Sequence, residues 1–175
     1  MKNKNENKVQ KRSDFAAKQE GPAFVEEVIS IRRVAKVIKG GRRLMFSAFV
    51  VSGDENGRVG VGLGKGREVA PAVSKAFKRA KKNLLEVPLK DATVPFEIMA
   101  KFGASKVLLR PAKKGTGMIA GGAVRQILGA LGIKDILAKS IGSSNSVNVS
   151  YATLKALKSL KNIASVKEAV GLSRN

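Results

Sequence analysis

Glycine occupies every second position in the short segment that runs from Val59 to Gly64, alternating with Val59, Val61 and Leu63. Successive side chains of a β-strand point to opposite faces, so this spacing predicts a strand with one apolar face and one bare face. A bare face allows another backbone, a helix or RNA to approach closely. This constrains the fold more than any other stretch, because it reserves one side of the strand for a close neighbour.

A β-hairpin is predicted to join this strand to the one before it. Asn56-Gly57 lies between the two alternating segments, and Asn-Gly is the strongest short-range hairpin signal because both residues tolerate positive φ. Further upstream, Phe24 to Lys39 is rich in Val and Ile and predicts one long or bent strand, which Gly40-Gly41 ends with a loop. The earlier alternating segment has one apolar face, formed by Leu44, Phe46, Ala48 and Val50.

An amphipathic helix is predicted for Glu68–Glu86, and Pro71 falls within its first turn, where proline is tolerated. Residues 24–86 are therefore expected to form a β-β-β-α unit. The predicted buried stripe recurs at intervals of three and four residues and consists of Val69, Val73, Phe77, Ala80 and Leu84.

The sequence predicts four parts: a flexible basic arm at residues 1–20, a first domain at 21–87, a linker at 88–95 and a second α+β domain at 96–175. The second domain contains two apolar runs joined through Gly103 and a glycine loop at residues 113–117. Its remaining expected elements are a helix near Gly122–Leu131, a segment Asp135–Ile141, a turn at Gly142–Asn145, a helix from Val147 to Leu160 capped by Asn145 or Ser146, and a short last helix near Val166–Val170.

The positive charge is concentrated in the first domain. Residues 32–82 contain fourteen Lys and Arg and only three acidic residues, a net +11 of the +21 carried by the whole chain. Such an excess creates a potential that attracts polyanions and predicts a nucleic-acid binder. One basic group brackets Gly40-Gly41, and a second forms the run Lys75, Lys78, Arg79, Lys81 and Lys82.

The inventory excludes several kinds of chemistry. The chain has no Cys, His or Trp, which excludes disulfides, thiol nucleophiles, imidazole bases and the usual zinc sites. No apolar run approaches the ~20 residues of a membrane span, and the N-terminus lacks the apolar core of a signal peptide, so a soluble cytoplasmic protein is expected. No metal or cofactor is expected either. Binding to an anionic membrane surface is the electrostatic alternative, which requires large apolar residues opposite the charges of a helix.

Two motifs offer an enzymatic interpretation. Residues 115–120 match G-x-G-x-x-A between a predicted strand and helix, and Asp135 lies about 20 residues downstream, as in a dinucleotide loop. Asp135, however, opens the next segment, whereas a ribose-binding acid ends a second strand, and no second run of βα units follows. A structural loop, or backbone N–H groups against RNA phosphate, is therefore the preferred explanation of the glycines. Asp54-Glu55 is interpreted as a pair of solvated turn residues rather than an acid/base pair.

Four motifs together resemble bacterial small-subunit ribosomal protein five: Val37–Arg43, Gly53–Val69, Gly115–Arg125 and Gly142–Val149. The resemblance runs from about Phe24 to Leu172. It implies an α+β fold in which a double-stranded-RNA-binding-like β-β-β-α domain precedes an α+β domain with a left-handed βαβ crossover. The sequence departs from the family pattern at Ser146, a position where family members commonly have proline.

The resemblance also implies a function in the cytoplasm as part of the small ribosomal subunit, with no catalysis, cofactor or small-molecule substrate. Family members bind small-subunit rRNA near the decoding region and the messenger RNA path, contact ribosomal proteins four and eight, assist assembly and influence decoding accuracy. The loop Arg32–Arg43 would correspond to the rRNA-binding loop near the spectinomycin site, Gly103–Arg110 would face protein four, and Asn145–Tyr151 would lie toward protein eight. A double-stranded-RNA-binding factor outside the ribosome is the alternative.

The candidate site residues follow from the charge pattern and from the resemblance. The candidate rRNA-binding residues are Arg32, Arg33, Lys36, Lys39, Gly40, Gly41, Arg42, Arg43, Arg58, Lys65, Arg67, Lys75, Lys78, Arg79, Lys82, Lys113 and Lys114. The candidate protein contacts are Gly103, Lys106, Arg110, Asn145, Asn148 and Tyr151.

Overall fold

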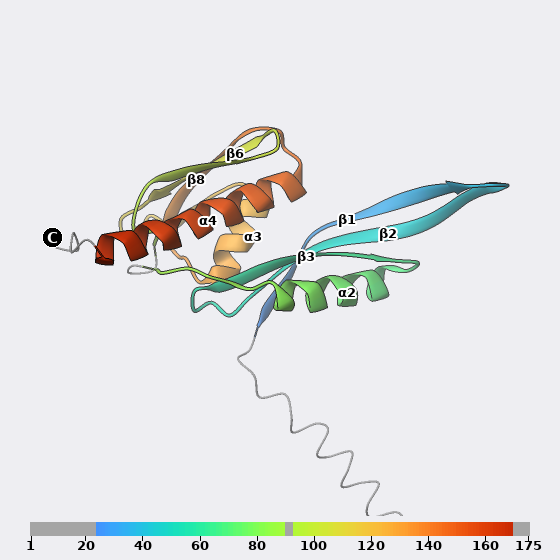
Figure 1. Cartoon of the computed structure of the whole chain (residues 1–175), viewed down its shortest axis with the longest axis horizontal. Coiled ribbons are helices and arrows are strands. Elements are labelled where there is room, and N and C mark those ends of the chain that lie inside the picture. Colours follow the sequence, from blue (N-terminus) through green and yellow to red (C-terminus); the bar gives the residue numbers. More distant parts are fainter. Residues whose placement is uncertain (1–23, 90–92, 170–175) are drawn as a thin grey trace, which may run out of the picture.

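The computed structural model describes residues 24–89 and 93–169, so the predicted arm at residues 1–20 lies outside the described residues. The chain forms two four-stranded sheets, ordered β1-β2-β3-β4 and β5-β6-β8-β7. Helix α2 (Val69–Lys82) packs on the first sheet and α4 (Ser146–Ala169) on the second, while α3 (Gly122–Leu131) lies between them, against β1, β2 and β3 on one side and α4 on the other. A long hairpin projects from the first sheet (Figure 1). None of the helices in these ranges is long and apolar enough to cross a membrane.

The first sheet begins with three antiparallel strands, β1 (Val25–Ile38), β2 (Gly41–Gly53) and β3 (Arg58–Gly66). The predicted long strand is confirmed, and its bend has a cause, since the register of β1 shifts between Val28 and Ser30. Helix α2 (Val69–Lys82) follows, and then a two-residue strand, β4 (Leu85–Glu86), pairs with the start of β3. The order is therefore β-β-β-α-β, and the predicted helix end at Glu86 was wrong because Leu85 and Glu86 belong to the sheet.

Helix α2 packs on the bare face of β3. A Cβ atom at Gly62 would collide with the backbone carbonyl oxygen of Ala76, and Gly60 and Gly64 meet Ala80 and Ala72 in the same way. These three alanines are the buried residues of the helix. The predicted stripe was therefore wrong in most of its members, because a helix this close to a strand has room only for methyl groups at the contact. Val73 and Phe77 are half-buried beside it, and Val69 is exposed.

The turn between β2 and β3 differs from the predicted Asn-Gly turn. Positive φ angles occur at Glu55 (56°) and Gly57 (92°) and not at Asn56. The loop Asp54–Gly57 is held instead by the carboxylate of Asp54, which accepts hydrogen bonds from the backbone N–H groups of Asn56 and Arg58 at 3.0 and 2.9 Å. Asp54 is buried, so its interpretation as a solvated turn residue was also wrong.

The second half supplies five further elements in the predicted order and one that was not predicted. Strands β5 (Ile98–Phe102), β6 (Ser105–Pro111) and β8 (Ile136–Gly142) are antiparallel neighbours, and β7 (Met118–Ile119), which was not predicted, pairs parallel with β8. Helix α3 (Gly122–Leu131) connects β7 to β8 as a βαβ unit, whose left hand stays a prediction.

Helix α4 (Ser146–Ala169) is longer than expected. It begins as predicted, since the Asn145 side-chain oxygen accepts the Val147 N–H at 3.1 Å and so caps the helix. It then continues without a break to Ala169, so a separate helix starting near Val166 was wrong.

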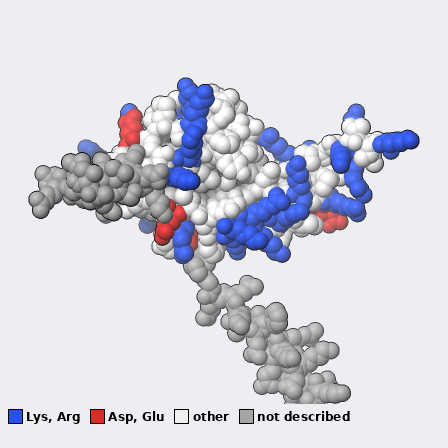
Figure 2. Space-filling model, in the orientation of Figure 1, with Lys and Arg blue, Asp and Glu red and all other residues white. Residues whose placement is uncertain are grey.

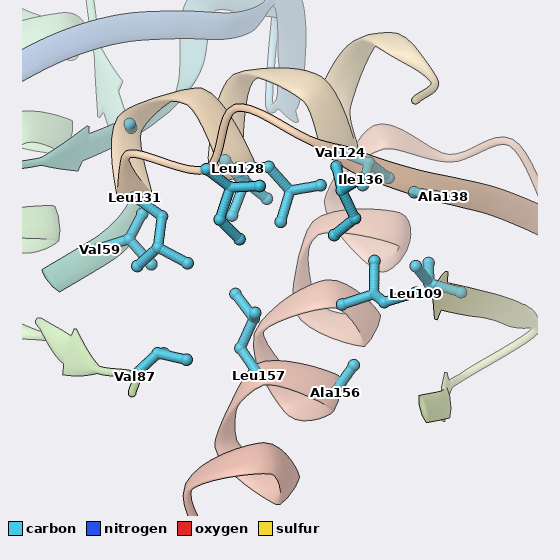
Figure 3. Close-up of a cluster of buried hydrophobic side chains, with 14 of the residues drawn as sticks. Val59, Val87, Leu109, Val124, Leu128, Leu131, Ile136, Ala138, Ala156 and Leu157 are labelled. Atoms are coloured by element: carbon cyan, nitrogen blue, oxygen red, sulfur yellow. The ribbon is translucent and has the colours of Figure 1, made fainter. Parts of the chain in front are cut away.

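A single core joins the two halves. Phe49, Val59 and Val61 of the first sheet belong to the same buried cluster as residues of α3, α4, β6 and β8. Figure 3 shows Val59 and Val87 on one side of this cluster, facing Leu131 and Leu157. Val87 and Val94, which flank or lie in the predicted linker, are both buried. The linker thus contributes to the core, while the predicted domain boundaries stay predictions.

Candidate nucleic-acid interface

The hairpin of β1 and β2 extends beyond the rest of its sheet. Strand β3 ends at Gly66, which pairs with Phe46, and Phe46 pairs with Arg33 on the other side. Outward from this point, residues 33–46 form a two-stranded ribbon that reaches the turn at Lys39 and Gly40, and Figure 1 shows it projecting from the body. Two strands without a third are marginally stable in water, so this projecting ribbon is suited to contact with a partner.

The strand register places basic residues on both faces of the projecting ribbon. Lys36 lies directly opposite Arg43, and Arg32 lies on the same face further back along the strand. Arg33 and Arg42 lie on the other face, which continues into the helix-covered side of the sheet. The ribbon therefore presents positive charge in two opposite directions.

These charges are not balanced within the described part of the chain. The described ion pairs are Arg58–Asp54, Lys81–Glu26 and Arg110–Glu97, and none of them involves a residue in the range 32–46. Like charges directly opposite each other destabilise a strand pair, as Lys36 and Arg43 do here. The arrangement costs stability in the free protein and becomes favourable beside a polyanion. All six basic residues concerned are exposed: Arg32, Arg33, Lys36, Lys39, Arg42 and Arg43.

The two glycines of the turn adopt backbone angles that other residues rarely adopt. Gly40 has φ of 92° and Gly41 has φ of 153°, which L side chains rarely adopt. A Cβ atom at either position would meet nothing within 4 Å. The space around the turn is open, so a partner can approach its backbone closely.

Three large apolar residues of the ribbon are exposed and were not among the predicted contacts. Val37 is 75% exposed, Leu44 53% and Ile38 49%. No sequence signal separates them from core residues, because their alternation matches that of the covered part of the same strands. Only the end of β3 at Gly66, opposite Phe46, leaves them uncovered.

The second basic group lies on helix α2, where the four candidates for RNA contact, Lys75, Lys78, Arg79 and Lys82, are all exposed. Arg79 Nη1 donates a hydrogen bond to the carbonyl oxygen of Leu63 at 2.6 Å, which fixes its side chain against strand β3. Figure 2 shows Lys and Arg gathered along α2 and out to the tip of the hairpin.

The large apolar residues of α2 do not provide the surface that membrane binding requires. Val73 and Phe77 are half-buried against the alanine cluster, with a groove of about 660 Å³ beside them. Lys81, on the rim of that groove, forms an ion pair with Glu26 at 2.7 Å and lies over the ring of Phe24. Val69 alone among these large residues is exposed.

Strand β3 brings three more candidates to different places. Lys65 is exposed and pairs with Ser47, which also pairs with Arg32, so Lys65 and Arg32 share one face at the base of the ribbon. Arg67 is exposed just beyond the strand. Arg58, at the other end of β3, has a structural role, because its Nε donates to Asp54 Oδ2 at 2.6 Å.

The environment of Asp54 determines its pKa. Burial by itself raises the pKa of this carboxyl, but hydrogen bonds from the Arg58 side chain, from the backbone N–H groups of Arg58 and Asn56, and the charge of Arg58 outweigh burial. The pKa of Asp54 therefore lies below its ordinary value of 3.8, and the residue is ionised at neutral pH.

The glycine loop at residues 115–117 is occupied by a side chain of the protein itself. Asp135 Oδ1 accepts hydrogen bonds from the backbone N–H groups of Gly115 and Gly117 at 3.0 and 2.8 Å. These are the groups that a dinucleotide phosphate would need. The geometry thus supports the structural interpretation of this loop, and Asp135 acts as its internal anion. Lys113 and Lys114 are exposed beside it.

The candidate protein contacts from two separate segments meet at one place. Gly103, at the turn between β5 and β6, has φ of 57°, and a Cβ atom on it would lie 3.4 Å from Asn148 Nδ2. The Tyr151 ring lies 5.1 Å from that of Phe102 and 6.2 Å from that of the buried Phe49. Phe102 is exposed and was not predicted as a contact. Gly103, Phe102, Asn148 and Tyr151 thus form one patch, called here the aromatic corner.

The other candidate contacts differ in whether their side chains already interact within the protein. Lys106 is exposed. Arg110 forms two hydrogen bonds with Glu97, at 2.8 and 3.1 Å, and these hydrogen bonds lower the pKa of Glu97. Asn145 is engaged as the cap of α4. Within the described ranges, no three residues among His, Cys, Asp and Glu come close enough to hold a metal ion.

Comparison with known proteins gives the same result for both halves of the chain. The family described as "Ribosomal protein S5, N-terminal domain" matches residues 24–88, and "Ribosomal protein S5, C-terminal domain" matches residues 100–170. The small ribosomal subunit protein uS5 of Lawsonia intracellularis is 51% identical over 148 residues, which cover 85% of this chain and 91% of that protein. The protein of the same description from Syntrophobacter fumaroxidans is 54% identical over 148 residues, covering 85% and 89%.

Proposed function

The chain belongs to the ribosomal protein S5 family, and we propose that it is a structural, non-catalytic constituent of the small ribosomal subunit that binds small-subunit rRNA. It acts in the cytoplasm, on the ribosome, in translation. The observation that carries the proposal is the projecting ribbon, whose basic residues are exposed on both faces and have no acidic partner in the described ranges.

In the proposed mechanism, the basic side chains of the ribbon neutralise phosphate groups of the rRNA. Lys and Arg that contact phosphates release the counterions condensed on the RNA, which drives binding and makes it dependent on salt. A narrow ribbon with charge on both faces can enter between two RNA segments and neutralise both. The basic face of α2 adds contacts at the base of the ribbon, in line with recognition of folded RNA by its backbone and shape.

Few aromatic residues are available for stacking on bases. The chain has seven Phe, one Tyr and no Trp, and Phe49, the most central of them, is buried. Base stacking of the single-strand type therefore contributes little, and the apolar residues of the ribbon, led by Val37, supply contact area beside the charges.

The finer partners are also part of the proposal. Ribosomal protein four would contact the side of the aromatic corner that includes Gly103, together with Lys106 and Arg110, while protein eight would approach Asn145, Asn148 and Tyr151. Since Gly103, Asn148 and Tyr151 belong to one patch, the aromatic corner, the two proteins would bind on adjacent sides of it. Through these contacts the protein would support subunit assembly and decoding accuracy near the messenger RNA path.

The first test is incorporation into subunits. A triple reversal, Arg32→Glu, Arg33→Glu and Arg42→Glu, is expected to abolish association with small subunits after gradient sedimentation and a moderate-salt wash, with the wild-type chain present at one copy per subunit. The matched control makes an equal change in net charge at three exposed lysines of the second half of the chain, with Lys134→Glu, Lys139→Glu and Lys158→Glu. Normal incorporation of the ribbon variant would refute the ribbon assignment.

The same gradient distinguishes the alternative function. A double-stranded-RNA-binding factor outside the ribosome would remain at the top of the gradient or associate at less than one copy per subunit. For the protein contacts, changes at Gly103 or Lys106 are expected to alter stop-codon readthrough more than assembly. Unchanged readthrough in a reporter strain carrying a Gly103→Arg variant would refute the assignment of this corner to decoding accuracy.

A further inference from the structure

The loop between β2 and β3 caps the end of helix α3. The N–H of Glu55 donates to the carbonyl oxygen of Ala130, and the N–H of Gly57 donates to that of Leu131, both at 3.1 Å. The last carbonyl groups of a helix have no partner within the helix, so the loop supplies what α3 lacks. This contact joins the first half of the chain to the second.

The loop also contains Asn56-Gly57, the dipeptide most prone to deamidation in flexible chains. In that reaction the backbone nitrogen of the glycine loses its proton and attacks the side-chain carbonyl carbon of the asparagine. The amide nitrogen leaves as ammonia, and a five-membered succinimide forms. Water then opens the ring at one of its two carbonyls and gives aspartate or isoaspartate, so the net change is one amide exchanged for one carboxylate.

The folded structure holds both reacting groups away from this chemistry. The Gly57 nitrogen belongs to a buried residue, and its proton is engaged with Leu131. The Gly57 carbonyl accepts the Val87 N–H at 2.8 Å, which fixes the glycine from its other side. The Asn56 side chain is tied down as well, since its Nδ2 donates to the Asp54 carbonyl oxygen at 2.8 Å.

We propose that Asn56 is a latent deamidation site, closed while the loop caps α3 and reactive when the loop lifts away. The reaction also prevents the loop from closing again. Isoaspartate adds one backbone carbon before Gly57 and displaces the N–H that meets Leu131. Either product also loses the side-chain N–H that donates to the Asp54 carbonyl oxygen, and adds a negative charge at a residue whose backbone N–H contacts the buried carboxylate of Asp54. The modification would thus mark chains whose two halves have separated and keep them separated.

The first measurement compares the full-length chain in native buffer at mildly alkaline pH with the same chain in denaturant. Peptide mapping by mass spectrometry follows aspartate and isoaspartate at position 56 over time. Because local opening limits the reaction in the folded chain, deamidation in native buffer is expected to be slower than in denaturant by a factor on the order of ten or more. Equal rates in the two conditions would overturn the proposal.

A pair of glycine variants tests the role of the cap. Gly132 has φ of 95°, and a Cβ atom there would collide with the carbonyl oxygen of Glu55, so Gly132→Ala pushes the loop away from α3. A Cβ atom at Gly129, in the same helix, would have nothing within 4 Å, which makes Gly129→Ala the matched control. Faster modification of Asn56 in folded Gly132→Ala than in Gly129→Ala is expected, and equal rates would refute the cap as the barrier. If Gly132→Ala does not fold, the comparison of native and denatured chain decides alone.

The irreversibility is tested by a mimic of the product. Asn56→Asp is expected to lower the thermal unfolding midpoint, because it replaces a donor to the Asp54 carbonyl with an acceptor. Asn145→Asp makes the same chemical change at another exposed asparagine, where a carboxylate caps α4 equally well, so its midpoint stays that of the wild type. A midpoint for Asn56→Asp equal to that of Asn145→Asp would refute the claim that modification opposes closure.

Discussion

The two ends of the β1–β2 hairpin are made of the same kind of sequence and have opposite surroundings. At the base, residues 46–53 of β2 have α2 on one face and the common core on the other, and Ala48, Phe49, Val50 and Val51 are all buried. At the tip, the alternating apolar residues of the projecting ribbon have no cover, and Val37 is the most exposed of them. Both ends pair antiparallel, and the one register shift, between Val28 and Ser30, lies at the base.

This comparison separates what a strand needs in order to form from what it needs in order to be stable alone. The base is stabilised by packing within the chain, whereas the tip carries the like-charged pair Lys36 and Arg43 and relies on backbone hydrogen bonds to its single neighbour. Substitutions at the base should therefore act on stability, and substitutions at the tip on binding.

The largest effect is expected for Gly62→Ala at the base. The added methyl would collide with the backbone of Ala76 and force α2 away from the sheet, which should lower the free energy of unfolding by about 3 kcal/mol. Urea denaturation of the isolated chain measures this. Gly40→Ala at the tip has open space and only the strain of its positive φ, about 1 kcal/mol. Equal losses for the two variants would erase the distinction between base and tip.

A smaller loss is expected for Asp54→Asn in the loop at the base. The variant leaves the Arg58 side chain and two backbone N–H groups with a weaker acceptor, at a cost of about 1–3 kcal/mol at neutral pH. Because the pKa of Asp54 is lowered on folding, its stabilisation is present above its ordinary pKa of 3.8 and is lost as the pH falls through the lower folded pKa.

The wild-type chain should therefore lose stability on acidification in this range, and Asp54→Asn should lose less. Unfolding curves between pH 7 and pH 2 provide the measurement, with Glu55→Gln, which changes an exposed side chain of the same loop, as the control. Parallel pH profiles for wild type and Asp54→Asn would contradict the prediction.

At the tip, the effect is expected in affinity rather than in stability. Arg33→Gln with Arg42→Gln removes the charge of one face, and Arg32→Gln with Lys36→Gln removes two charges of the other. If RNA contacts both faces, each pair should weaken binding to small-subunit rRNA by roughly tenfold and reduce the salt dependence by about one phosphate contact per residue. Filter binding at several salt concentrations would reveal a one-sided contact as a loss confined to one pair.

The smallest effect has opposite signs in the two measurements. Lys36→Thr removes the repulsion with Arg43 and introduces a good strand former, which should raise the free energy of unfolding by about 0.2–1 kcal/mol. The same change should weaken RNA binding. A variant that gains both stability and affinity would show that the charge of Lys36 has no role at the interface.

Much of the fold could be predicted from the sequence because local pattern and final environment agree there. The strands around the glycine alternation, helix α3 at Gly122–Leu131 and the cap at Asn145 were all predicted correctly. The errors lie where a contact with a distant segment overrides the local pattern. The sheet draws Leu85 and Glu86 out of the predicted helix, and the closeness of β3 selects alanines over the larger residues of α2.

The candidate site divides in the same way. The positions of the basic residues can be read from the sequence, and the exposed ones at the tip are those predicted. The sequence did not indicate that Arg58 is held by Asp54, or that the Gly115–Gly117 loop is filled by Asp135. It also did not indicate that Phe102 lies beside Tyr151. These pairings depend on distances across the folded chain, which local spacing does not encode.

By itself, the sequence determined the charge of this protein, the bare face of β3 and the absence of thiol and imidazole chemistry, since these depend only on residue type and period. Only the tertiary structure decided which charges remain free. An arginine that lies beside a buried carboxylate, such as Arg58, stabilises the fold, whereas an arginine without an acidic neighbour, such as Arg42, is available for binding. Because β3 ends at Gly66, opposite Phe46, β2 has no third strand beside it beyond this point, and the two-stranded ribbon begins there. Burial and partnership are relations between distant segments, so they exist only once the chain has folded.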